Sequence, residues 1–220
     1  MFASPISLSK IMFGIFIVGV LSIVALAGFA DPSVIPRLMH DPAIIADIHP
    51  LTGAVSSLGA FLWMSTAAIC AFSAVVLTAD EPGRSRAFLI SVAAISLFLC
   101  FDDFFMFHEW IAKYKLGLPE TVIFAGLGAA VLTHILYFRA IIQSQSYGIF
   151  LCALAALGMS VAVDILPSPS GQIAAIWRGF AEDGFKWIGI GLWTYFHVAA
   201  AYGLVKRYGT RIGPVDGKTD

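Results

Sequence analysis

The chain of 220 residues is too apolar for a soluble globular protein, because 59% of its residues are hydrophobic and only 12% are charged, against about 25% charged in a typical soluble domain. Thirteen Lys and Arg nearly balance fourteen Asp and Glu, for a formal net charge of −1, so the chain lacks the basic field that holds a nucleic acid. Nucleic-acid binding is therefore excluded, and membrane lipids are the expected partners.

Six stretches are apolar and long enough to cross a bilayer as helices, since a hydrocarbon core about 30 Å thick needs about 20 helical residues. The first also resembles a cleavable signal peptide, because Lys10 precedes an apolar run that ends in small residues, but the length of that run favours a retained helix. The sequence predicts an all-α, polytopic helical bundle that forms one transmembrane domain in a bacterial plasma membrane. The predicted spans are 11–30, 51–78, 87–112, 121–141, 147–165 and 182–205.

Two segments between the predicted spans are expected to lie at the membrane surface. Four prolines between residues 31 and 50 prevent one continuous helix there and favour a short surface segment. Residues 172–181 carry Trp177 and Arg178 beside apolar neighbours, which predicts a brief interfacial helix before the last span.

The distribution of Lys and Arg predicts the orientation, because these residues favour the cytoplasmic side of short loops. With the N-terminus inside, both termini are cytoplasmic, and most of the acidic residues near the spans face outward. This orientation places eight of the thirteen basic residues in the cytoplasm: Lys10, Arg84, Arg86, Arg139, Lys206, Arg207, Arg211 and Lys218.

The third predicted span is unusual because it contains ionisable residues. If the span continues as one helix to Ala112, Asp102 lies about 15 Å from the outer end of that helix. An acid near the bilayer centre costs about 2.5 to 3.5 kcal/mol on insertion scales, so it needs a partner, a proton or water. Helical spacing places Asp102 and Glu109 within about 20° of each other, on one face, whereas Asp103 and His108 point elsewhere.

The last predicted span carries a polar stripe on an otherwise apolar helix. Glu182, Lys186 and His197 lie within about 60° of one another, with Asp183 at the edge of the stripe. Lys186 can pair with Glu182 at i,i+4, whereas His197 has no such local partner. We therefore expect the stripe to face the polar side of the third span inside the bundle.

Carboxylates and imidazoles are common ligands of zinc, manganese and iron, which makes a divalent metal ion such as zinc the expected cofactor. The predicted ligands are Asp102, His108, Glu109, Glu182 and Asp183. Asp103 is then the predicted base that deprotonates a metal-bound water. The function predicted first is a membrane-embedded, metal-assisted hydrolase that acts on a lipid or another membrane-delivered substrate. The zincin motif HExxH is incomplete, since Ala112 stands where its second histidine belongs.

Other interpretations stay open. The same acids, with Lys186 and His197, would form a proton or cation pathway in a coupled transporter. A non-catalytic membrane subunit would use them for helix packing, within a homo-oligomer or a larger membrane complex. His134 of the fourth span and His197 lie about 20 and 22 Å from the outer ends of their helices, and this matched depth would let them bind haem b as axial ligands.

Overall fold

The computed structural model describes residues 5–29, 31–77, 83–167 and 170–208, without the side chains of residues 5–12, 15, 26 and 27. Ala30 and Thr78, at the ends of two predicted spans, lie outside the described residues. So do Arg211, Lys218 and the side chain of Lys10, which contribute to the predicted orientation.

The chain divides into two compact units, residues 1–54 and 55–220, where the sequence predicts a single domain. The helices that lie within the first unit are α1 (Pro5–Phe29), α2 (Ile35–Met39) and α3 (Pro42–Ala46). The prolines of this unit start short helices, as Pro42 does in α3, where the Asp41 carboxylate accepts a hydrogen bond of 2.8 Å from the Ala43 amide. The first predicted span falls on α1, and its described apolar stretch is Phe16–Ala25.

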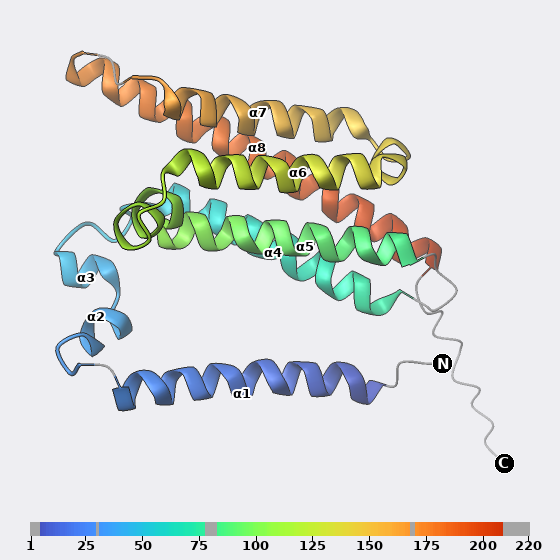
Figure 1. Ribbon diagram of the computed structural model, residues 1–220, viewed down its shortest axis with the longest axis horizontal. Helices are drawn as coiled ribbons and strands as arrows, with labels where there is room; N and C mark the ends of the chain where they lie inside the picture. The colour runs from blue at the N-terminus through green and yellow to red at the C-terminus, as the bar shows by residue number, and fades with distance from the viewer. Residues whose placement is uncertain (1–4, 30, 78–82, 168–169, 209–220) are drawn as a thin grey trace. The chain divides into compact units, whose positions relative to one another are not determined.

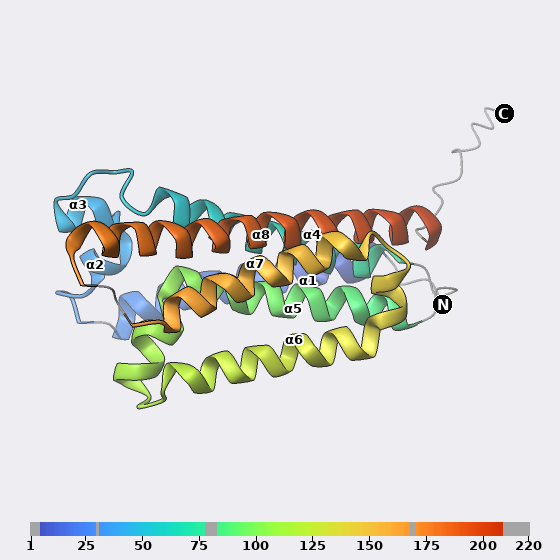
Figure 2. The same ribbon diagram turned by 90° about the horizontal axis from the view of Figure 1, so that it is seen from above.

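The second unit is a helical membrane bundle whose long helices run side by side in alternating directions (Figures 1 and 2). Its helices are α4, which begins at the unit boundary (Ala54–Val76), α5 (Gly83–Phe105), the π-helix η1 (Phe107–Lys115), α6 (Glu120–Gln143), α7 (Tyr147–Ile165) and α8 (Gln172–Tyr208). All but η1 are long and apolar enough to span a bilayer. The protein is therefore a multi-pass membrane protein.

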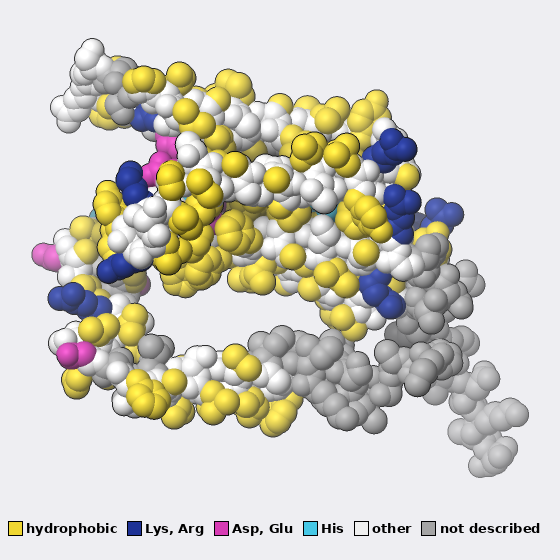
Figure 3. Space-filling model, viewed as in Figure 1, with side chains coloured by type: hydrophobic (Ala, Val, Ile, Leu, Met, Phe, Trp, Pro, Cys, Tyr) yellow, Lys and Arg dark blue, Asp and Glu magenta, His cyan; other side chains and the backbone are white. Residues whose placement is uncertain are grey.

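Aromatic side chains fill the interior of the second unit. Trp63 of α4 packs edge-on against Trp193 of α8, with ring centres 5.8 Å apart. Phe150 of α7 is buried beside Trp193, and Phe88 of α5 is buried beside His197 of α8. Hydrophobic side chains cover the flanks of the helices, and Lys and Arg gather at the two ends (Figure 3). Apolar flanks between charged ends are what a bilayer requires of a bundle.

The α-helix of the third predicted span ends sooner than the sequence indicates. The span was expected to continue to Ala112, but α5 ends at Phe105 because Met106 adopts a left-handed conformation with φ 50° and ψ 49°. The chain then forms the π-helix η1. Asp102 consequently lies three residues from the end of α5, about 4.5 Å along its axis, and not about 15 Å from the end of a longer helix.

The last helix begins sooner than the sequence indicates. Residues 172–181 do not form a separate interfacial helix but are the first turns of α8, which continues without a break for 37 residues. Arg178 fixes this extension to the end of α7, because its Nη2 donates to the Asp164 carbonyl at 2.6 Å and its Nε to the Val163 carbonyl at 3.1 Å. These carbonyls belong to the last turn of α7, which has no intrahelical donors for them.

Candidate functional site

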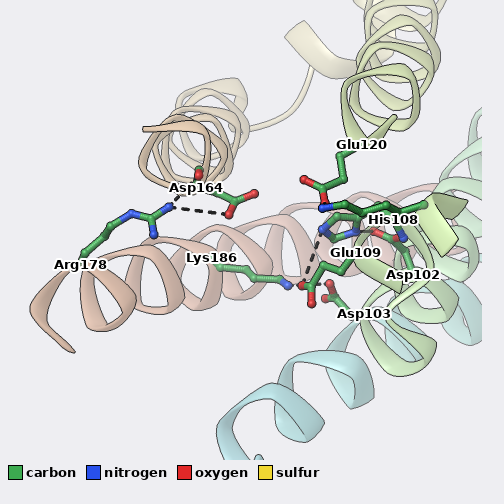
Figure 4. Close-up of polar contacts among 9 residues, drawn as sticks. Asp102, Asp103, His108, Glu109, Glu120, Asp164, Arg178 and Lys186 are labelled. Carbon is green, nitrogen blue, oxygen red and sulfur yellow. Dashed lines mark hydrogen bonds and ion pairs between the residues drawn. The ribbon is translucent and has the colours of Figure 1, made fainter. Parts of the chain in front are cut away.

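Ionisable side chains gather at the end of the bundle where α5 ends and the first half of α8 passes (Figure 4). The term charged cluster denotes Asp102 and Asp103 of α5, His108 and Glu109 of η1, and Lys186 of α8. Two short contacts organise it, and each joins α5 to a different element.

The first contact joins Asp102 to His108. Because the backbone turns at Met106, His108 comes back onto the acid, whose Oδ1 accepts from the His108 amide at 2.9 Å and whose Oδ2 contacts the ring Nδ1 at 2.7 Å. Both residues are buried, with 4% and 8% of their surfaces exposed. The hydrogen bond to Asp102 raises the pKa of His108 above its ordinary value of 6.5, although burial acts in the opposite direction. The pair therefore favours a charged imidazolium beside a carboxylate.

The second contact joins Asp103 to Lys186. The lysine Nζ lies 2.6 Å from Oδ1 of Asp103, and the indole Nε1 of Trp63 donates to Oδ2 at 2.9 Å. The Asp103 side chain is 7% exposed and that of Lys186 is 33% exposed. A cavity of about 30 Å³, with room for about one water molecule, adjoins this pair and is also lined by Asp183 and Gly59. One carboxylate thus connects α4, α5 and α8.

These contacts differ from two sequence-based predictions. Asp102 and Glu109 were expected on one helical face, but the break at Met106 separates them, and the Glu109 side chain is 60% exposed, with its Oε1 3.7 Å from Nε2 of His108. Lys186 was expected to pair with Glu182, but it binds the buried carboxylate of Asp103 instead. A buried carboxylate competes better for the ammonium, because it has less access to water.

The predicted metal ligands do not assemble. Within the ranges described above, no three His, Cys, Asp or Glu side chains are placed to hold a metal ion. Glu182 is partly buried one turn before Lys186, and Asp183 is exposed at the small cavity. The ammonium of Lys186 also lies among the carboxylates, where it repels a dication. The geometry therefore favours a network of ion pairs over a metal centre.

Trp63 also belongs to this site, although it was not predicted from the sequence. It lies in an uncharged, apolar helix, where an indole is expected to pack in the core, and nothing in its sequence context marks it as a hydrogen-bond donor to Asp103. Only the pairing of α4 with α5 reveals the contact.

His134 of α6 and His197 of α8 lie away from the charged cluster but close to each other. Their ring centres are 6.1 Å apart, and both residues are buried. The ring of Phe88 lies 5.2 Å from that of His134 and 6.0 Å from that of His197, so it is nearly equidistant from both. A haem held by both histidines would need this space for its porphyrin, and the structure therefore does not support the haem prediction.

The comparisons with known proteins concern the chain as a whole. No curated protein and no solved structure matches it. A protein family does match, over residues 14–200, which include every helix of the bundle at least in part. The chain belongs to this family, which is described as Domain of unknown function (DUF8692).

Proposed function

We propose that the protein is a proton-coupled transporter of a bacterial plasma membrane, with the charged cluster as its proton-binding site at the outer face. The observation that carries the proposal is the contact of 2.6 Å between Asp103 and Lys186, which links α5 to α8 next to the Asp102–His108 pair. Ionisable residues between membrane helices ordinarily serve substrate or ion pathways.

Proton binding at this site has a direct mechanical consequence. With His108 protonated, the two aspartates are balanced by an imidazolium and an ammonium. A further proton on Asp103 removes its negative charge and with it the attraction that holds Lys186. The first half of α8 is then released from α5, while Lys186 extends toward water. A proton therefore biases two arrangements of the same helices, as coupled transport requires.

Metal-assisted hydrolysis, the function predicted first from the sequence, has less support. It needs three protein ligands around one ion, and the described side chains supply no such group. It also needs a base with free access to a bound water, whereas both oxygens of Asp103 already accept contacts from Lys186 and Trp63. A packing role is the remaining alternative, and the experiment below separates it from transport.

The test uses purified protein in lipid vesicles that contain a pH-sensitive dye. The vesicles carry an inside-negative potential, and a small-molecule extract of bacterial cells supplies the solute outside. The wild-type protein should acidify the interior faster than protein-free vesicles do, and Asp103→Asn should abolish the difference. Asp164→Asn is the matched control, because Asp164 also faces a cation of α8 but its carboxylate lies 4.0 Å from Arg178, outside the charged cluster.

The outcomes decide between the functions. Proton influx that is lost in Asp103→Asn and kept in Asp164→Asn supports coupled transport. Influx equal to that of protein-free vesicles refutes the proposal, and so does influx that Asp103→Asn leaves unchanged. If Asp103→Asn lowers only the stability of the protein, the cluster serves packing.

A further inference from the structure

The buried histidine pair contains two polar atoms that have no partner. Nε2 of His134 and Nε2 of His197 are both inaccessible to solvent, and no described group is within hydrogen-bonding reach of either. Nearly all buried side-chain nitrogens in proteins are hydrogen-bonded. Two exceptions on neighbouring rings indicate that the pair binds something other than a protein side chain.

The opposite nitrogen of each ring is held by the protein. Nδ1 of His197 lies 2.9 Å from the Trp193 carbonyl oxygen, which can only accept, so Nδ1 carries the proton and Nε2 keeps a free lone pair. Nδ1 of His134 lies 2.8 Å from the Ser91 hydroxyl, which can accept in the same way. Histidine ligands of metals are commonly oriented by such a hydrogen bond from the second nitrogen.

The spacing of the rings suits one ion between them. Metal bonds to imidazole nitrogen are about 2 Å long, so two imidazoles on opposite sides of one ion have ring centres roughly 6 Å apart. The observed separation is 6.1 Å. Phe88 occupies the space that a porphyrin would need, as described above, whereas a bare ion needs far less room.

The surroundings select the kind of ion. The neighbouring rings are all uncharged, and the described residues contribute no third His, Cys, Asp or Glu. These rings belong to Phe88, Phe138, Phe150, Trp193 and Phe196. Zinc needs four ligands, calcium and magnesium need six or more oxygens, and copper(II) and nickel(II) prefer four in a plane. A dication would also keep its charge unbalanced in an apolar interior. Copper(I) is monovalent and is satisfied by two nitrogen donors in a line.

We propose that His134 and His197 bind one copper(I) ion within the bundle. The test is an anaerobic titration of the purified full-length protein with copper(I), in competition with a coloured copper(I) chelator. The titrated protein carries Cys152→Ser, because Cys152 is an exposed thiol that would bind the ion by itself. One ion per chain is expected to bind. His134→Ala and His197→Ala should each weaken binding by more than roughly 100-fold, beyond the loss caused by outer-shell substitutions.

Two matched controls and a second measurement make the test decisive. His40→Ala and His49→Ala remove exposed histidines of the first unit and should leave the titration unchanged. X-ray absorption of the loaded protein should show two nitrogen neighbours at about 2 Å. The absence of a stoichiometric site overturns the proposal, as does retained binding in the His134 and His197 variants. Sulfur neighbours or four ligands in the absorption spectrum overturn it even if an alanine variant fails to fold.

Discussion

Removing Lys186 should destabilise the protein more than removing its partner does. Lys186→Met leaves the carboxylate of Asp103, 7% exposed, with the Trp63 indole as its remaining contact. Leaving a buried charge without its partner costs about 3 to 5 kcal/mol. Because Trp63 still donates a hydrogen bond to Asp103, we expect Lys186→Met to lower the free energy of unfolding by about 3 kcal/mol. Asp103→Asn costs less, about 1 to 2 kcal/mol, because Lys186 is one-third exposed and reaches water when released.

The double variant provides the sharper measurement. With Asn at position 103, no buried charge remains to be stranded, so adding Lys186→Met should cost less than about 0.5 kcal/mol, which gives a coupling energy of about 2 to 3 kcal/mol. The assay is unfolding in mixed micelles with increasing sodium dodecyl sulfate, followed by helical circular dichroism. Lys113→Met is the control, because Lys113 forms an exposed pair with Glu120 at 3.0 Å, of a kind worth about 0 to 1 kcal/mol. Additive single effects, or equal losses in Lys186→Met and Lys113→Met, would refute the reasoning.

Two further predictions concern the pH dependence and the packing of the bundle. Because the folded pKa of His108 is raised above 6.5, its contribution to stability is complete below that pH and is lost as the pH rises through the folded pKa. The stability gap between wild type and His108→Gln in pH-stepped unfolding should therefore shrink as the pH rises, and Asp102→Asn should remove this dependence. Gly189→Ala should destabilise by about 1 to 3 kcal/mol, because its Cβ would lie 2.6 Å from Cγ of Leu157, whereas Gly191→Ala, with open space around it, should be neutral or stabilising by up to about 1 kcal/mol in the same unfolding assay.

The long helices could be predicted from the sequence because hydropathy is a local property, summed over about twenty residues. Among the described residues, five of the predicted spans are helices of sufficient length and apolarity, and α8 was predicted although it contains Lys186. The end of α5 could not be found in this way. It depends on the left-handed Met106 and on a hydrogen bond from the His108 amide to Asp102, and neither follows from helical periodicity.

Most residues of the charged cluster could be predicted from the sequence, but the contacts between them could not. Asp102, Asp103, His108 and Lys186 were all identified, because charge within an apolar stretch is conspicuous in a sequence. Their partners could not be assigned, since other cations, such as Lys113, are much closer to Asp103 along the chain than Lys186 is. Only the packing of α5 against α8 brings Asp103 and Lys186 together. For the same reason the role of Trp63 could not be predicted.

Because α8 is long, the thickness of the surrounding bilayer affects the strength of the ion pair between Asp103 and Lys186. Its 37 residues extend for about 55 Å, well beyond a hydrocarbon core of about 30 Å. Lys206 and Arg207 make its last turn basic, so we expect that turn at one membrane surface. Lys186 precedes Lys206 by twenty residues, about 30 Å along the axis, so we expect it at the opposite boundary of the hydrocarbon. Longer acyl chains draw lipid over the contact between Asp103 and Lys186 and strengthen it, whereas shorter chains admit water and weaken it.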